Sequence, residues 1–259
     1  MITIGMPSYN NPTEVWATLS ALKLYQNLTD VELLVVDNAN NQEVQKIAKS
    51  MDARCEVYTE KQGTGPAKNA VFDFAAGDFV LCMDSHVMLW PESVERLRIW
   101  FNTHTDKSAN LIHGPMAYDS LKRFSWEWIP KWRGNMWGIW DKARKWVPQA
   151  VMQIQAAAMG LFGCRKDSWL RFPDGHKGFG GQACVIHEKY RKAGRTSLLL
   201  PWLKWVHNFH RERVPYQVHQ CDIINNYLAG FEELGLDPEP IYEHFGREKV
   251  EGIKNGMSK

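Results

Sequence analysis

Apolar and polar positions alternate in blocks along the first half of the chain. Short apolar runs have the length of strands: Ile2–Met6, Val31–Val36, Cys55–Tyr58, Phe79–Met83 and Leu111–His113. The segments between them carry apolar residues at helical spacing and predict helices over Pro12–Leu24, Gln42–Met51, Pro66–Ala76 and Pro91–Phe101. Strands that alternate with helices predict an α/β fold with a parallel, doubly wound sheet.

The second half, from about Ala117, is less regular. It holds a Trp-rich stretch, a Gly-rich turn at Gly178–Gly181, a helical segment from about Gln182 to Ala193, and an apolar run, Leu198–Val206, that leads to His207. The tail from Arg211 looks mainly helical, and Ile223–Leu234 is its clearest helix. We expect three parts, residues 1–116, 117–210 and 211–259. Because no repeat or low-complexity linker separates them, we expect the two halves to share one core.

Composition and charge limit the function classes only a little. The 259 residues are 44% hydrophobic and 23% charged, which is ordinary for a soluble globular protein. The formal net charge is only +2, so attraction to an acidic partner needs a local cationic patch. Five scattered cysteines without a Cys-x-x-Cys pair argue against a disulfide framework or a structural zinc site, and for a reducing compartment.

No apolar run approaches the 18 residues that a membrane-spanning helix needs. The chain opens directly on a strand, without the pattern of a signal peptide. We therefore expect a cytoplasmic protein, although an anchor removed from the chain would leave the same sequence. The oligomeric state is not readable from these features.

The most informative segment is the apolar run Phe79–Met83, which ends in Asp84, Ser85 and His86. If the strand geometry continues, Asp84 and His86 point to the same side. A carboxylate oxygen and a neutral imidazole nitrogen suit a divalent ion such as Mn²⁺. The alternative is an ordinary capped turn.

Two other segments beyond strand ends carry candidate ligand-binding groups. Asp37 follows an apolar strand, and either caps an Asx-turn or accepts hydrogen bonds from the base or ribose of a nucleotide. The loop Gly63-Thr-Gly65-Pro-Ala-Lys68-Asn69 precedes a helix and is neither a Walker A loop nor a complete dinucleotide-binding fingerprint. A helix N-terminus with one cation suits a diphosphate, but a plain loop would have the same sequence.

Taken in order, these segments resemble the GT-A glycosyltransferases of the family 2 type. The segments in the first half are Met6-Pro-Ser-Tyr-Asn10, Leu34-Val-Val-Asp37-Asn, Gly65-Pro-Ala-Lys68-Asn69, Ala76-Gly-Asp78 and Met83-Asp84-Ser-His86. Many enzymes of this class carry Asp-x-Asp where this chain has Asp84-Ser-His86. The Asp-Ser-His form resembles the triplet of the polypeptide N-acetylgalactosaminyltransferases and their bacterial and viral relatives. Further along, the matching segments are Phe124-Ser-Trp126-Glu-Trp128, Ala158-Met-Gly160-Leu-Phe162, Phe179-Gly-Gly-Gln182 and Trp205-Val-His207-Asn-Phe209.

The resemblance covers roughly residues 2–211 and implies a fold, a cofactor and a donor. The fold would be a Rossmann-like nucleotide-binding half fused to an acceptor-binding half around one mostly parallel sheet. Asp84, His86 and His207 would hold Mn²⁺ or Mg²⁺ on the diphosphate of a UDP-sugar, either a hexose or an N-acetylhexosamine. The residues implied in nucleotide-sugar binding are Pro7, Tyr9, Asn10, Asp37, Gly65, Lys68, Asp84, Ser85, Gly160, Gly181 and Arg211.

Gln182 departs from the pattern, since the family usually has Gly-Gly-Glu where this chain has Gly180-Gly181-Gln182. Inverting relatives need a carboxylate near this helix start as a general base, and an amide cannot take that role. The substitution favours a retaining reaction, in which the departing phosphate takes the acceptor's proton. The substitution also leaves the identity of the donor sugar undetermined, because in the family this acid helps to recognise sugar hydroxyls. Glu188 is a possible substitute acid or a plain helix-surface residue.

The stretch Lys122–Trp146 combines six Trp with seven Lys and Arg against two acids. It is either a structural lid with solvated charges or a platform for an acceptor, because indoles stack on sugars or bases and cations follow phosphates. Hydroxymethylated bases in DNA, as modified by some bacteriophage glycosyltransferases, combine rings with negative charge. A glycan precursor or a protein Ser/Thr is an equally open acceptor.

Two functions of other classes compete with sugar transfer. A nucleotide- or carbohydrate-binding module would bind its ligand without turnover. A nucleotidyltransferase would release pyrophosphate, but it would need two carboxylates at the metal, whereas the candidate pair here is an acid with an imidazole.

Overall fold

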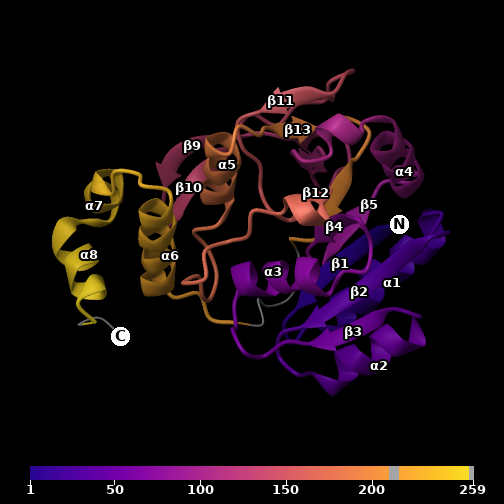
Figure 1. Ribbon diagram of the computed structural model, residues 1–259, viewed down its shortest axis with the longest axis horizontal. Coiled ribbons are helices and arrows are strands. Elements are labelled where there is room, and N and C mark those ends of the chain that lie inside the picture. The colour runs from indigo at the N-terminus through magenta and orange to yellow at the C-terminus, as the bar shows by residue number, and fades with distance from the viewer. Residues whose placement is uncertain (210–215, 257–259) are drawn as a thin grey trace.

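An eight-stranded sheet runs through the middle of the computed structural model, which describes residues 1–209 and 216–256 (Figure 1). The strand order is β11-β13-β6-β12-β4-β1-β2-β3. Four of its seven pairings are parallel, and three of these join β1, β2, β3 and β4. In chain order the strands are β1 (Ile2–Ser8), β2 (Val31–Asp37), β3 (Arg54–Val57), β4 (Phe79–Met83), β6 (Leu111–His113), β11 (Met152–Ile154), β12 (Leu161–Arg165) and β13 (Ser197–Leu199).

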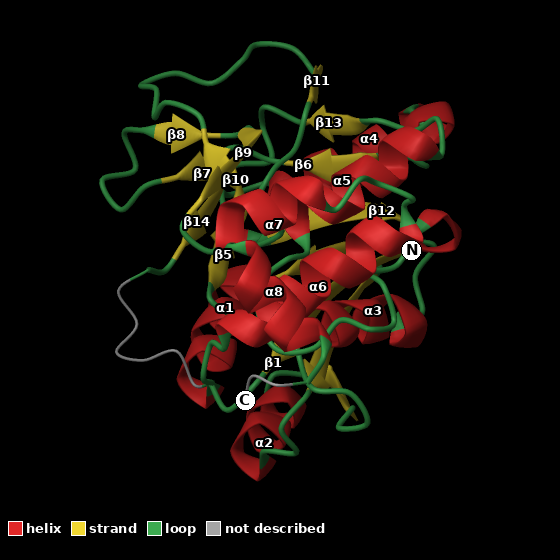
Figure 2. Ribbon diagram, turned by 90° about the vertical axis from the view of Figure 1, so that its left-hand side faces the viewer, coloured by secondary structure: helices red, strands yellow, loops and turns green. Residues whose placement is uncertain are grey.

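The alternation of side chains along the strands decides which helices cover each face. In β2, Leu33 and Val35 point into a cluster with the apolar residues of α1 (Pro12–Tyr25), α2 (Gln42–Ser50) and α4 (Ser93–Thr103). Leu34 and Val36 point the other way, toward α3 (Thr64–Phe74) and α5 (Ala183–Lys192). Figures 1 and 2 show helices on both faces of the sheet. The predicted α/β layering is confirmed.

The prediction of a mostly parallel sheet holds with one qualification. Strand β12 runs antiparallel to both of its neighbours, β4 and β6, and β11 runs antiparallel to β13. Since β12 follows the irregular middle of the chain without a crossover helix, it enters the sheet from the opposite end. Its backbone then begins beside the end of β4, where Asp84 donates its N–H to the carbonyl of Gly160 at 2.9 Å.

A smaller sheet stands at the carboxyl end of β4. Its order is β5-β14-β7-β8, with β5 (Val87–Leu89), β7 (Met116–Ala117), β8 (Phe124–Ser125) and β14 (Trp205–His207). The apolar run Leu198–Val206, which leads to His207, divides into β13 of the large sheet and β14 of the small one. A turn closed by Leu203 N–H and the carbonyl of Leu200 separates the two strands.

The Trp-rich stretch is more regular than its sequence suggested. It forms the hairpin β9 (Trp128–Arg133) and β10 (Met136–Trp140), which packs against α6 (Gln220–Glu233) and α7 (Glu239–Phe245). Trp132 lies within ring contact of Tyr227, His244 and Phe245. The helix α8 (Arg247–Lys254) completes this cluster and lies beside α6 and α7 in Figure 1.

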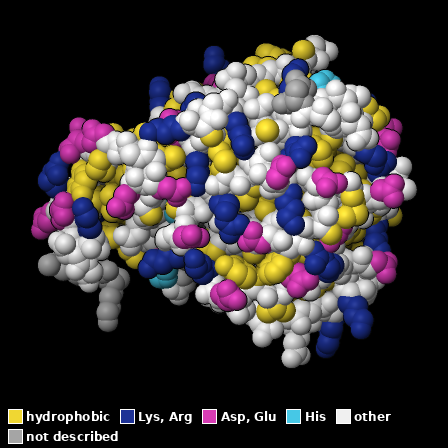
Figure 3. Space-filling model, in the orientation of Figure 1, with side chains coloured by type: hydrophobic (Ala, Val, Ile, Leu, Met, Phe, Trp, Pro, Cys, Tyr) yellow, Lys and Arg dark blue, Asp and Glu magenta, His cyan; other side chains and the backbone are white. Residues whose placement is uncertain are grey.

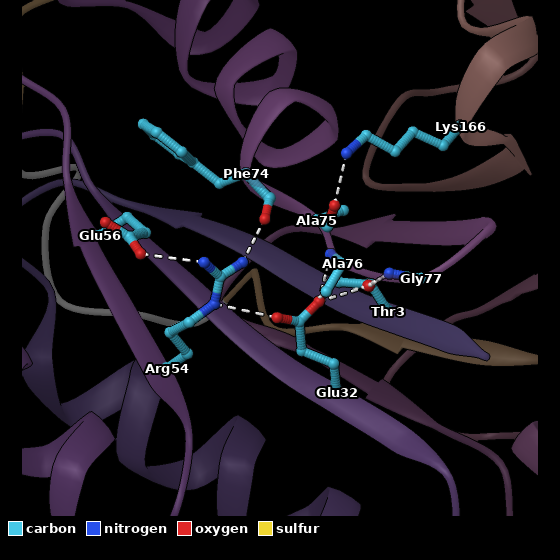
Figure 4. A network of polar contacts seen from close by, with 9 residues as sticks. All are labelled: Thr3, Glu32, Arg54, Glu56, Phe74, Ala75, Ala76, Gly77 and Lys166. Carbon is cyan, nitrogen blue, oxygen red and sulfur yellow. Dashed lines mark hydrogen bonds and ion pairs between the residues drawn. The ribbon is translucent and has the colours of Figure 1, made fainter.

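A polar network ties the opposite end of the sheet together (Figure 4). The carboxylate of Glu32 accepts hydrogen bonds from Thr3 Oγ1 at 2.5 Å, Ala76 N at 2.7 Å and Arg54 Nε at 2.9 Å. The Arg54 guanidinium and the Lys166 ammonium reach the carbonyls of Phe74 and Ala75 at the end of α3. Cations at a helix C-terminus stabilise its unpaired carbonyls, so this network fixes α3 against three strands.

Charge is distributed without one dominant field on the face in Figure 3, where Lys and Arg are mixed with Asp and Glu. None of the helices within residues 1–209 and 216–256 is both long and apolar enough to cross a membrane.

Candidate active site

Asp84, His86 and His207 meet where the two sheets adjoin. One potential ligand atom from each lies within 4.8 Å of the other two. Asp84 and His86 follow β4, and His207 ends β14, whose register sets His207 opposite Val87 of β5. This pairing brings His86 Nε2 to 3.0 Å from His207 Nε2, across 121 residues of sequence. The small sheet therefore assembles the three side chains.

The geometry of this group fits a divalent ion. Two imidazole nitrogens bound to one ion at about 2.1 Å and roughly a right angle lie about 3 Å apart, as the two Nε2 atoms do. Asp84 Oδ2 lies 3.9 Å from His86 Nε2, and among the described residues it supplies the group's carboxylate. The side chains of His86 and Asp84 are 9% and 22% exposed, so the group is partly shielded and still reachable.

Lys68 is the cation beside this carboxylate. Its Nζ lies 2.9 Å from Asp84 Oδ1 and donates to the carbonyl of Met159 at 2.5 Å, and its side chain is only 3% exposed. Burial alone would raise the pKa of Asp84, but Lys68, His86 and His207 together outweigh it and hold that pKa below its usual value. Asp84 is therefore an ionised carboxylate.

A chain of hydrogen bonds fixes the turn that carries the triplet. Asn11 Oδ1 accepts from Ser8 Oγ at 2.7 Å, and Asn11 Nδ2 donates to Ser85 Oγ at 2.5 Å. Thr18 on α1 donates to the carbonyl of Ser85. The sequence reading did not single out Asn11, although its place between a strand and the Pro12 that opens α1 marks it as a capping position.

The residues predicted at the end of β1 lie along the same sheet edge. The parallel registers set Ser8 beside Asp37 and Gly5 beside Cys82, so the loops after β1, β2 and β4 adjoin. Pro7 and Tyr9 are partly exposed there, and Asn10 is exposed in the left-handed region with a φ of 51°. Tyr9 also makes an edge-on ring contact with Tyr216.

Asp37 is buried, and its carboxylate organises its own loop. Oδ2 accepts from Asn41 N at 2.6 Å and Gln45 Nε2 at 3.0 Å, and Oδ1 accepts from Ala39 N at 3.1 Å. This geometry is that of the Asx-turn, the first of the two alternatives for Asp37, and the turn's carboxylate is buried. A nucleotide contact by Asp37 stays a prediction.

The segment Gly63–Asn69, expected to be a loop before a helix, is the first part of α3 from Thr64 on, and another part of the chain covers it. Thr64 N–H donates to the carbonyl of Gly178, and Gly63 forms a bridge with Gly178. A Cβ at Gly65 would lie 3.4 Å from the ring of His176. The expected diphosphate cradle at this helix start is therefore lined by residues 176–178 and is not an open N-terminus.

Gly160 and Gly181, both predicted to bind the nucleotide-sugar, let other side chains approach the backbone closely. A Cβ at Gly160 would come within 3.0 Å of the Trp205 ring and 3.4 Å of Asp84 Oδ2, so the bare backbone keeps the space beside that carboxylate. Gly181 has a φ of 80°, and a Cβ there would meet Asn226 on α6 at 2.7 Å. Gly160 borders the candidate metal site, whereas Gly181 packs against a helix.

A comparison with protein-family models matches residues 3–160 to the model described as glycosyl transferase family 2. The match covers more than half of the chain. The chain belongs to glycosyl transferase family 2. It is thus a glycosyltransferase, and the predicted enzyme class is confirmed. A comparison with curated protein sequences finds no match.

Solved structures of glycosyltransferases share the fold of this family 2 chain. GalNAc-T7 in complex with UDP, GalNAc and Mn²⁺ superposes with a TM-score of 0.69 at 14% identity, over 90% of this chain and 47% of that one. TarS from S. aureus gives a TM-score of 0.59 at 16% identity, over 99% and 42%. The mannosyltransferase PcManGT from Pyrobaculum calidifontis, with GDP-Man and Mn²⁺, gives 0.56 at 14%, over 99% and 73%. The chain thus spans less than half the length of the first two, and the likeness shows the GT-A fold.

Gln182 stands at the start of α5 in this glycosyltransferase. Its side chain is buried, and its amide nitrogen has no hydrogen-bond partner within the part of the chain that the structure describes. Glu188, the possible substitute acid, pairs with Arg191 one turn further along the same helix. Arg211, predicted to bind the nucleotide, lies outside the described residues.

Most of the six tryptophans of the predicted acceptor platform pack inside the enzyme. Trp126 and Trp128 are buried, and Trp132, Trp137 and Trp140 are partly buried. Trp146 is 60% exposed, and Arg144 lies over its ring and over that of Trp126. One indole of the platform, that of Trp146, is thus exposed, and the exposed cations nearest to it in sequence are Lys142 and Lys145.

Proposed function

We propose that this family 2 enzyme transfers a sugar from a UDP-sugar, a hexose or an N-acetylhexosamine, to a hydroxyl acceptor in a metal-dependent reaction. The observation that carries the proposal is the group of Asp84, His86 and His207, whose ligand atoms lie within 4.8 Å of one another. GalNAc-T7 and PcManGT, which share the fold, were solved with Mn²⁺ together with UDP or GDP-Man. UDP fits the Asp-Ser-His resemblance, and GDP is the alternative nucleotide.

Each site residue would have a distinct role. Asp84 Oδ2 and the two Nε2 atoms would hold Mn²⁺ or Mg²⁺, which when bound supplies positive charge to the diphosphate leaving group. Asn11 and Thr18 hold the turn at Ser85, so that Asp84 and His86 keep their orientation. Pro7, Tyr9 and Asn10, beside them on the sheet edge, would contact the nucleoside.

The reaction would retain the anomeric configuration of the donor. The family acid is replaced by Gln182, and Glu188 is paired with Arg191, so neither offers a free carboxylate as a general base. The unpaired amide of Gln182 would instead donate a hydrogen bond to a sugar hydroxyl.

Metal-dependent hydrolysis of UDP-sugars tests the proposal. The purified protein should release UDP from at least one UDP-hexose or UDP-N-acetylhexosamine with Mn²⁺, and should lose that release with a chelator. NMR assignment of a transferred product should show the donor's configuration. Binding without turnover would instead identify a non-catalytic module, and pyrophosphate release would identify a nucleotidyltransferase.

For the acceptor, hydroxymethylated bases in DNA are our first proposal. The support is Trp146 with Lys142 and Lys145, an exposed ring beside two exposed cations. A glycan precursor or a protein Ser/Thr is the alternative acceptor for the same chemistry.

A further inference from the structure

Lys68 is a buried charge whose place beside the metal group has a consequence for metal binding. It lies on α3, and its ammonium contacts Asp84 Oδ1, the carbonyl of Met159 and, at 5.8 Å, the ring of Phe162. A buried ammonium needs such partners, because burial disfavours its charge. Lys68 is therefore a fixed part of the site, and it is not a surface lysine that swings in from solvent.

Because of this ion pair, the two carboxylate oxygens of Asp84 face different groups. Oδ1 faces Lys68 at 2.9 Å, while Oδ2 faces His86 at 3.9 Å. Only Oδ2 is left for an ion held with the two imidazoles. The carboxylate also carries the group's only negative charge, and the neighbouring ammonium cancels it. Within residues 1–209 and 216–256, this group thus offers a dication three donor atoms, and its one negative charge is balanced by Lys68.

We propose that Lys68 makes metal binding depend on a bound nucleoside diphosphate. The ammonium repels a bare dication and shares its carboxylate, so the ion alone binds weakly. The diphosphate supplies the negative charge that the protein's own donor set lacks, and ion and nucleotide then bind together. This inference rests on the proposed function. It adds that the metal and the nucleotide bind to the site together.

Binding measurements separate this role from a structural one. The Kd of Mn²⁺ would be measured from the electron paramagnetic resonance of the free ion, with and without saturating UDP. The wild type should bind Mn²⁺ at least about tenfold more tightly with UDP, and UDP should gain the same factor from Mn²⁺, because coupling is reciprocal. Lys68→Met should bind the bare ion at least about tenfold more tightly than the wild type, and its coupling to UDP should shrink. Lys68→Arg, which keeps the charge, should behave as the wild type.

Two further variants complete the comparison. Lys68→Gln keeps a hydrogen-bond donor for Asp84 and Met159 without the charge, and serves if Lys68→Met does not fold. Lys166→Met removes another lysine that donates to a backbone carbonyl, at the far end of the sheet, and should leave the Mn²⁺ affinity unchanged. Equal or weaker binding of bare Mn²⁺ by folded Lys68→Met and Lys68→Gln would overturn the inference. Absence of Mn²⁺ binding by the wild type, even with UDP, would overturn the proposed function instead.

Discussion

A different contact fixes each of the three side chains of the metal group, Asp84, His86 and His207. Asp84 is ionised beside Lys68, His86 follows a turn held by Asn11, and His207 is placed by strand register. None of the three forms part of an apolar cluster. Removal of either imidazole should therefore affect binding of the metal more than folding, whereas removal of Asp84 also takes the counter-charge from the buried Lys68 ammonium.

The first prediction concerns these three side chains. Asp84→Ala, His86→Ala and His207→Ala should each lower metal-dependent sugar transfer by about a thousandfold or more, since a lost ligand costs several kcal/mol of transition-state stabilisation. Release of UDP would be measured at saturating donor and Mn²⁺, with circular dichroism as the test of folding. Asp78→Ala, which removes an exposed acid just before the same strand, is the matched control and should keep full activity. Full activity in one of the three variants would remove that residue from the proposed ligands.

Among the elements, α3 depends on the polar network at its C-terminal end. Glu32→Ala should lower the free energy of unfolding by about 2 kcal/mol, because Ala76 N–H loses its acceptor and Thr3 and Arg54 lose a partner (Figure 4). Glu56→Ala removes a more exposed acid that pairs with Arg54, and should cost less than about 1 kcal/mol. Urea unfolding of both variants makes the comparison. Equal losses would show that the network is no stronger than a surface ion pair.

The loop between β12 and α5 contains a buried histidine that links stability to pH. Burial lowers the pKa of His176 to about 4, from about 6.5 in an unfolded chain. Between these values the unfolded state binds more protons, so this contribution is fully present above pH 6.5 and is lost as the pH falls toward 4. Burial lowers the pKa of His187 in the same direction. Urea unfolding from pH 7.5 to 5 should show falling stability, and His176→Gln should show a shallower fall. An unchanged slope in that variant would exclude His176 as a source.

The sequence predicted long elements and strand ends better than it predicted how they meet. The apolar runs at 31–36 and 79–83 placed Asp37 and Asp84 at one sheet edge, because parallel strands end together. Strands of two or three residues, such as β7 and β14, are too short to show a period. The contact of His86 with His207 depends on the register of β14 with β5, which no local pattern contains. Likewise, the burial of Asp37 depends on how its loop folds back on α2.

At the scale of the whole molecule, the small sheet sets the distance between the metal group and the proposed acceptor surface. Register pairs Val206 with Ala117 and Ala117 with Phe124, and Phe124 bridges to Arg144. Three strand spacings, or roughly 14 Å, thus separate the Arg144 backbone from the strand that carries His207. An acceptor that contacts both places would have to span this distance, as a short stretch of DNA does.

If DNA is that acceptor, transfer to hydroxymethylated DNA should fall steeply between 50 and about 200 mM salt as phosphate contacts are screened. Lys142→Glu with Lys145→Glu should raise the acceptor KM severalfold and leave UDP-sugar hydrolysis unchanged. Arg144 is unsuitable for charge reversal, because it pairs with Asp141 and lies over Trp126. Lys46→Glu with Lys49→Glu on α2 carries the same charge change and should have no effect. Salt-insensitive transfer would leave the Trp-rich stretch with a structural role alone.

The meeting of His86 and His207 across 121 residues also has a consequence for protein synthesis. A ribosome makes Asp84 and His86 together with the first four strands of the large sheet, and makes His207 only after β13 has been completed. A nascent chain therefore holds an incomplete donor set until the small sheet can close. Capture of the ion would then report that both sheets have assembled, and truncated products of translation would be unable to retain it.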